Sequence, residues 1–231
     1  MVVFPVKIPI KSINLSPGSH LLIENVSWEQ YESVLEELGE ERTNPRINYS
    51  NNILELMSPL PIHERPHRII TYIVITIWDI QDRDWEDFGS TTFKKLKKAG
   101  LEADTCFYIA NSEQVRSLKR IDLEINPPPD LAIEADVTSK TTLEAYETIK
   151  VPELWIFTDL NLKIYVLEKD GYQESNISPT FPGNIGGRKS TPQFADLDIV
   201  RMIPELVEQA FNQGTRRMLK SLREKLSQSE S

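Results

Sequence analysis

The sequence predicts an α/β protein whose sheet contains parallel strands, with a C-terminal helix. Residues 131–137 read as a mostly apolar strand, a helix capped at Thr138 or Ser139 follows, and residues 153–157 read as a second strand. A strand, a helix and a strand in succession form a right-handed crossover, which requires parallel strands. Short β-rich runs and amphipathic helical segments elsewhere in the chain favour the same class.

Turn and cap signals define a helix and a hairpin early in the chain. Ser27 and Gln30 form a capping box, and apolar residues then recur at helical spacing until Gly39. Residues 46–49 and 53–57 are β-rich runs separated by residues that tolerate tight turns, which predicts a hairpin.

The middle of the chain is expected to contain a buried helix and two more strands. Pro59 and Pro61 lack the N–H that a strand needs, so the sheet ends there. Apolar pairs at four-residue spacing predict a buried helix over about 63–81. Residues 88–93 and 103–109 are the next predicted strands, separated by a basic segment.

The last third of the chain predicts a loop and a long helix. Residues 175–192 are rich in Ser, Pro, Gly and Asn, and Pro204 is expected to open the C-terminal helix. The sequence shows no internal repeat, so the simplest division is a single domain over 1–231. Its core would cover about 22–200 and its C-terminal helix about 203–227.

Charge, cysteine content and the length of apolar runs limit the classes of function that the chain can have. The 231 residues carry a net charge of −9, which opposes generic binding to nucleic acid or to anionic membranes, so any nucleic-acid role needs a local basic patch. Cys106 is the single cysteine, which excludes an internal disulfide and a CxxC metal cluster. The longest apolar run, 69–80, is too short to span a bilayer. We expect a soluble, cytoplasmic protein with no membrane partner.

Acidic residues inside predicted strands are the most informative positions. The two-residue period places Glu134 and Asp136 on one face of an otherwise apolar strand. Asp104 stands at the start of another strand, and the three carboxylates together would offer the oxygen ligands that Mg²⁺ or Mn²⁺ prefers. Two simpler interpretations stay open: Asp136 caps the next helix, and Asp104 marks a solvent-facing strand entry.

A histidine motif precedes the buried helix. His63 and His67 belong to the string HERPH, which has the spacing of a zinc-protease motif. That chemistry needs an unbroken helix, and Pro66 disfavours helical geometry at Arg65. The sequence therefore argues against a zinc site and favours surface histidines.

Basic residues concentrate in two segments. Residues 94–120 hold seven basic and three acidic residues, and residues 214–231 hold five and two. The first segment is either a solvated loop or, beside a metal site, a phosphate contact. Its candidate nucleic-acid-binding residues are Lys94, Lys95, Lys97 and Lys98.

Three blocks of sequence resemble one known family. They are LELMSPLPIHE, EADTCFYIAN and PPPDLAIEADVTSKTTLEAYETIKVPELWIF, and their order and spacing resemble the Uma2 (DUF820) family of the PD-(D/E)xK superfamily. The resemblance implies a restriction-endonuclease-like fold, in which a mixed β-sheet is flanked by helices, and a Mg²⁺-dependent phosphodiesterase core. It also implies that Asp104 is the first acid of the site, Glu134 the second, and His63 the associated histidine.

The chain departs from the superfamily motif at its lysine. Asp136 stands where (D/E)xK expects lysine, and Thr142 stands where many family members carry one on the following helix. Lys140 lies two residues earlier, and its flexible side chain could reach the same space. Lys140 is therefore the candidate substitute.

The leading hypothesis is a metal-dependent endonuclease that hydrolyses phosphodiester bonds of DNA with Mg²⁺ or Mn²⁺. A catalytically inactive protein that binds nucleic acid or another partner is the alternative, and a hydrolase of small phosphoesters is a third possibility. The resemblance and the half-apolar C-terminal helix together predict a homodimer.

Overall fold

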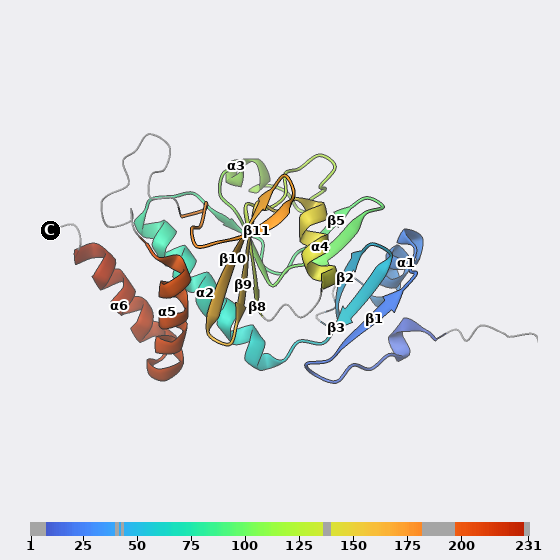
Figure 1. Ribbon diagram of the computed structural model, residues 1–231, viewed down its shortest axis with the longest axis horizontal. Helices are drawn as coiled ribbons and strands as arrows, with labels where there is room; N and C mark the ends of the chain where they lie inside the picture. Colours follow the sequence, from blue (N-terminus) through green and yellow to red (C-terminus); the bar gives the residue numbers. More distant parts are fainter. Residues whose placement is uncertain (1–7, 40–41, 43, 136–139, 182–196, 229–231) are drawn as a thin grey trace, which may run out of the picture.

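Two β-sheets and six α-helices make up the part of the chain that the computed structural model describes (Figure 1). The described residues are 8–39, 42, 44–135, 140–181 and 197–228. The antiparallel sheet consists, in spatial order, of β1 (His20–Glu24), β3 (Ile53–Met57), β2 (Arg46–Ser50), β6 (Ala99–Glu102) and β5 (Thr92–Lys95). The mixed sheet consists of β11 (Gly171–Ser175), β10 (Asn161–Glu168), β9 (Glu153–Thr158), β8 (Leu131–Ala135), β7 (Thr105–Tyr108) and β4 (Glu86–Asp87).

Helices separate and cover the two sheets. They are α1 (Trp28–Leu38), α2 (Pro61–Ile80), α3 (Ser112–Val115), α4 (Lys140–Ile149), α5 (Ile199–Gln213) and α6 (Thr215–Gln228). Figure 1 shows α4 between the sheets, with α2, α5 and α6 on the far side of the mixed sheet. Buried Tyr146 and Ile149 of α4 share one apolar cluster with Leu101 of the antiparallel sheet and Leu154 of the mixed sheet.

The α/β class and the predicted crossover are confirmed. Strands β8 and β9 pair in parallel, with Leu131 opposite Glu153, and α4 lies between them in the chain. The expected cap at Thr138 or Ser139 lies outside the described residues, as does Asp136. The first helix is confirmed with its capping box: Ser27 accepts from the Gln30 N–H, and the Gln30 side chain accepts from the Ser27 N–H.

The predicted hairpin is confirmed as β2 and β3. Asn51 and Asn52 form its turn with φ of 50° and 62°, the left-handed conformation that two-residue hairpin loops require. Strand β1, which the sequence did not predict, pairs with the outer edge of β3. Its exposed Leu22 weakens the alternating pattern by which it could have been detected.

Two predictions around the histidine motif are wrong: Pro66 does not break the helix, and His67 does not lie on the surface. Pro61 occupies the first turn of α2, and the helix continues through Pro66 to Ile80. Proline is tolerated at the first helical position because its missing N–H would have no partner there, and Pro66 loses one further hydrogen bond without ending the helix. His67 is 1% exposed, so it is a buried histidine and not a surface one.

Two boundary predictions also need correction. Of the expected strand 88–93, only 92–93 form a strand, the start of β5; residues 88–91, with Gly89 at φ 53°, link β4 to β5, and the basic segment forms the β5–β6 hairpin. The expected C-terminal helix is two helices, α5 and α6, because Gly214 adopts φ 92° after Gln213. Pro204 lies inside α5 and does not open it.

Helix α6 packs within the chain. Met218, Leu222 and Leu226 are buried in the apolar cluster that also contains Ile69 of α2 and Val207 of α5. The apolar face that suggested a dimer is therefore covered by the same chain. Among the described residues, no helix is both long enough and apolar enough to cross a bilayer.

Substitutions at Gly100 and Tyr31 test how α1 packs on the antiparallel sheet. The Tyr31 ring stacks on Tyr49 at 4.9 Å, and a Cβ on Gly100 would overlap the Tyr31 hydroxyl. We expect Gly100→Ala to lower the free energy of unfolding by about 1–3 kcal/mol through overpacking. Tyr31→Phe should be neutral or stabilising, because that buried hydroxyl has no hydrogen-bond partner among the described residues. Urea denaturation measures both; an unchanged midpoint for Gly100→Ala would contradict this packing.

Candidate functional site

Asp104 and Glu134 lie on neighbouring chain segments. Strands β7 and β8 pair antiparallel with Thr105 opposite Ile133, and continuing this register brings Asp104 opposite Glu134. Both side chains are buried, at 7% and 4% exposure. Oδ2 of Asp104 accepts a hydrogen bond from the Ala135 N–H at 2.7 Å, which fixes the carboxylate across the end of β8.

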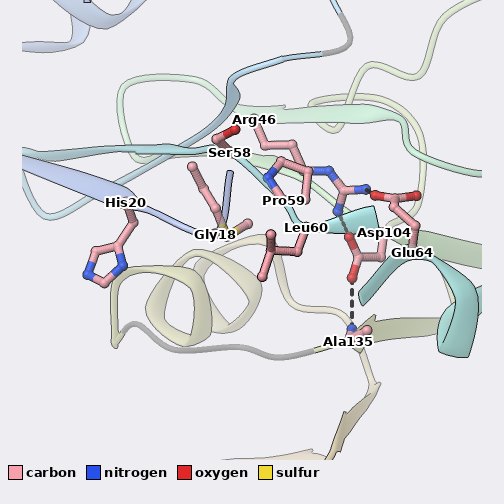
Figure 2. A pocket seen from close by; sticks show the side chains of 10 residues that line it. Gly18, His20, Arg46, Ser58, Pro59, Leu60, Glu64, Asp104 and Ala135 are labelled. Carbon is pink, nitrogen blue, oxygen red and sulfur yellow. Dashed lines mark hydrogen bonds and ion pairs between the residues drawn. The ribbon is translucent and has the colours of Figure 1, made fainter. Parts of the chain in front are cut away.

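Arg46 joins the acids at the start of β2. Its Nη1 forms an ion pair with Oδ1 of Asp104, and its Nη2 donates to Oε1 of Glu64 at 2.8 Å (Figure 2). Arg46 is 9% exposed, so its guanidinium is largely removed from water. The guanidinium offsets the cost of burying the Asp104 carboxylate, whereas the Glu64 side chain stays 38% exposed. This pairing explains how the fold retains acidic side chains at this position.

Glu64, His67 and Asp104 could together hold a metal ion. Their potential ligand atoms all lie within 4.8 Å of one another, about twice the distance between a divalent ion and an oxygen ligand. Two carboxylates suit Mg²⁺ or Mn²⁺, and the imidazole favours a transition metal such as Mn²⁺. The donor set therefore fits a divalent cation. We call Arg46, Glu64, His67 and Asp104 the acid–arginine cluster.

Glu134 is held beside this cluster but is not a member of the metal-ligand group. The Tyr146 hydroxyl of α4 donates to Oε1 of Glu134. Burial raises the pKa of Glu134 to about 7, against the lowering effects of that hydrogen bond and of the positive charge of Arg46. The charge of Glu55 raises it further. Glu134 therefore changes its protonation state near neutral pH.

A polar network occupies the place where the family lysine was expected. Thr142 is 6% exposed, and its hydroxyl donates to Oε2 of Glu55 at 3.0 Å. The side-chain amide of Asn48 donates to Oγ1 of Thr142 at 3.1 Å. Threonine at this position thus ties α4 to β2 and β3 without a positive charge.

A pocket of about 190 Å³ opens onto the cluster (Figure 2). Asp104, Glu64 and Arg46 line one end, and His20 lies at the other. The wall between them is mainly apolar and includes Met57, Pro59 and Leu60. A substrate group entering the pocket would therefore meet the buried charges at one end only.

The structure brings some predicted site residues together and leaves others undescribed. Asp104 belongs to the acid–arginine cluster, and Glu134 lies next to it. His63 and Lys140 lie on α2 and α4, but their side chains are outside the described part of the structure. His67, one turn after His63, is the histidine that meets Asp104.

The lysines of the β5–β6 hairpin lie away from this pocket. Lys97 is in the turn before β6, whereas Asp104 follows the other end of that strand. Lys94 pairs with Glu32 of α1 at 2.9 Å, and Lys95 with Glu124 at 3.7 Å. Acidic neighbours therefore offset part of the predicted basic patch.

Sequence reasoning missed Arg46, Glu64, His67 and Glu55. Glu55 carried a detectable signal, because it is an acid between Leu54 and Leu56 in a strand, the same pattern that identified Glu134. Glu64 and His67 were present in the histidine motif but were set aside on account of Pro66. Arg46 carried no local signal, since one arginine at a strand start is ordinary.

The chain belongs to the Uma2 family, whose profile, described as "Putative restriction endonuclease", matches residues 28–195. A similar solved structure is a protein of Anabaena variabilis described as a putative nuclease belonging to DUF820. It is 12% identical, the match covers 64% of this chain and 83% of that chain, and the TM-score is 0.46. Among curated proteins, none matches the chain.

The raised pKa of Glu134 predicts a pH-dependent stability. Because the folded-state pKa, about 7, exceeds the ordinary value of 4.5, the protonated acid stabilises the fold fully below about pH 4.5. That contribution is lost as the pH rises through about 7. In buffer with EDTA, Glu134→Gln should remove this dependence and be the more stable protein at pH 8, by an amount on the order of a few kcal/mol.

Urea denaturation at several pH values between 5 and 8 measures this difference. Glu205→Gln on the exposed side of α5 is the matched control and should follow the wild type. Parallel profiles for the wild type and Glu134→Gln would contradict the assignment.

Proposed function

We propose that the protein is a metal-dependent endonuclease that hydrolyses phosphodiester bonds of DNA. The observation that carries the proposal is the acid–arginine cluster of a Uma2 chain, in which Asp104, Glu64 and Arg46 line the end of a pocket and the buried His67 lies beside them. Nucleases of this kind need a divalent ion and a cation beside the scissile phosphate.

Each residue of the cluster has a part in the proposed reaction. Asp104, Glu64 and His67 would hold Mn²⁺ or Mg²⁺, which when bound polarises the phosphate and lowers the pKa of a water molecule. Arg46 supplies the positive charge that the missing motif lysine would otherwise provide, and its planar fork matches phosphate oxygens. Glu134 is the second acid, and a nearby cation favours its ionised form.

Several finer assignments are proposed on the family resemblance or the composition alone. Lys140, at the first residue of α4, is a second candidate for the missing cation, and His63 and Asp136 are kept as candidate site residues. Mg²⁺ as the ion in the cell, a homodimer and a cytoplasmic location are proposed on the same basis. A single domain over the whole chain is also part of this proposal.

A catalytically inactive binding protein is the second candidate function. Two observations favour it: Arg46 already forms ion pairs with both Asp104 and Glu64, and the uncharged Thr142, hydrogen-bonded to Asn48 and Glu55, stands where lysine was expected. The two candidates differ in metal binding, because an inactive site filled by Arg46 has no need of an ion.

Asp104→Asn tests the proposed function directly. Purified wild-type protein should nick supercoiled plasmid DNA in Mn²⁺, and Asp104→Asn should lower the rate by about 10²-fold or more, because it removes a charged ligand. Glu205→Gln, on the exposed side of α5, is the control and should keep the wild-type rate. If the wild type cleaves neither DNA nor RNA with Mn²⁺ or Mg²⁺, the inactive binding protein is the better account.

Arg46→Ala tests whether the positive charge of the guanidinium competes with the metal ion for the carboxylates. Removing the guanidinium leaves Asp104 and Glu64 without their cation, so Mn²⁺ should bind about 10-fold or more tightly while DNA cleavage falls. Without metal the variant should melt earlier, and added Mn²⁺ should raise its Tm more than it raises that of the wild type. Calorimetric titration and thermal melting measure both effects; weaker Mn²⁺ binding in Arg46→Ala would show that Arg46 does not compete with the ion.

A further inference from the structure

The exposed side of α6 is strongly basic in an otherwise acidic chain. The helix holds five basic residues and one acidic residue, although the whole chain carries a net charge of −9. Its basic residues are Arg216, Arg217, Lys220, Arg223 and Lys225, and all are exposed. This concentration of charge is not needed to solubilise a chain that already has a large net charge.

The other side of α6 is occupied by the protein itself. Met218, Leu222 and Leu226 are at most 4% exposed and pack into the cluster with α2 and α5. An amphipathic helix that binds a membrane inserts its apolar face, and α6 has none to offer. What α6 presents to a partner is therefore positive charge.

Arg216, Arg217 and Arg223 form no ion pair within the described part of the chain. Lys220 pairs with Glu224 of the same helix at 3.6 Å, with both side chains more than half exposed. Exposed pairs of this kind are weak and exchange readily. Lys94 and Lys95 of the β5–β6 hairpin, by contrast, each have an acidic partner on another segment.

In Figure 1 both α2 and α6 begin toward the lower edge of the molecule and run to the upper left. The Arg65 guanidinium stands over the Phe211 ring, 4.6 Å from its centre, and Phe211 is in the last turn of α5 just before α6 begins. Arg65 immediately follows Glu64 of the acid–arginine cluster. The contact thus links the end of α2 that carries Glu64 to the start of α6.

Helix α2 continues this surface. Arg65, Arg68 and Tyr72 are exposed and recur at helical spacing along one side of α2, and the charge of Arg68 also opposes the rise that burial causes in the pKa of Asp87 in β4. Tyr72 is 50% exposed, and an exposed aromatic ring beside arginines suits contact with nucleotides. We define the α2–α6 basic face by its charged residues Arg65, Arg68, Arg216, Arg217, Lys220 and Arg223.

We propose that the α2–α6 basic face, and not the Lys94–Lys98 hairpin, binds the phosphate backbone of nucleic acid. This proposal depends on the proposed function only in its choice of ligand, because DNA is the polyanion that the proposed nuclease must bring to the cluster at Glu64. Guanidinium groups match phosphate oxygens in pairs, and arginine provides five of the six charges of the face. Binding would be independent of base sequence, because phosphate contacts position a duplex without reading it.

Two charge-matched variants test the proposal. Arg216→Glu/Arg217→Glu and Lys97→Glu/Lys98→Glu change the net charge equally, and all four side chains are exposed. Binding to a fluorescein-labelled DNA duplex is measured by anisotropy in EDTA between about 50 and 200 mM salt, so that cleavage does not interfere. We expect the α6 variant to raise the Kd about 10-fold or more and to lower the salt slope by roughly 2, about 0.9 per lost phosphate contact. The hairpin variant should keep the wild-type slope.

Other results would overturn the proposal. They are equal losses in both variants, no loss in the α6 variant, or no binding of the duplex by the wild type. A loss by the α6 variant of binding to anionic phospholipid vesicles, with DNA binding intact, would assign the face to membranes instead. Circular dichroism and thermal melting confirm that both variants fold. Because the assay needs no cleavage, the expected pattern in a protein that cuts no DNA would support this face while rejecting the endonuclease.

Discussion

Arg46 holds the site together through two ion pairs, one with the buried carboxylate of Asp104 and one with the partly exposed carboxylate of Glu64. A cation beside a buried carboxylate offsets the free-energy cost of removing it from water. The guanidinium also acts on Glu134 and opposes the rise of its pKa. One side chain at the start of β2 thus acts on acids from a helix, a loop and a strand.

The fold brings these segments together through its connections. Pro59 and Pro61 end β3 and start α2, so Glu64 and His67 lie in the first turns of the helix beside the strand that Arg46 begins. The loop between β6 and β7 joins the two sheets and carries Asp104 at the junction. Helix α4 fills the space between the sheets and provides the hydroxyls that hold Glu134 and Glu55. The site therefore lies where both sheets and two helices meet.

The sequence predicted the parts of this arrangement that depend on local pattern. The period-two placement of Glu134 in an apolar strand, the Asn-rich hairpin turn and the capping box at Ser27 are local signals, and each named its element correctly. Arg46 and Asp104 are 58 positions apart, and no local pattern reports a contact of that range. The proline rule failed at Pro66 because burial of the apolar face of α2 outweighs one lost hydrogen bond. Because of that error, Glu64 and His67 were not assigned to the site from the sequence.

We infer that the acid–arginine cluster is a metal site in which the positive charge of Arg46 occupies the place of the ion until the ion binds. A crystal soaked in Mn²⁺ and measured at a wavelength where manganese scatters anomalously tests this inference. An anomalous peak is expected within ligand distance, about 2.0–2.6 Å, of Asp104, Glu64 and His67, with the Arg46 guanidinium moved off Asp104. The absence of a peak at saturating Mn²⁺, with both Arg46 ion pairs intact, would contradict it.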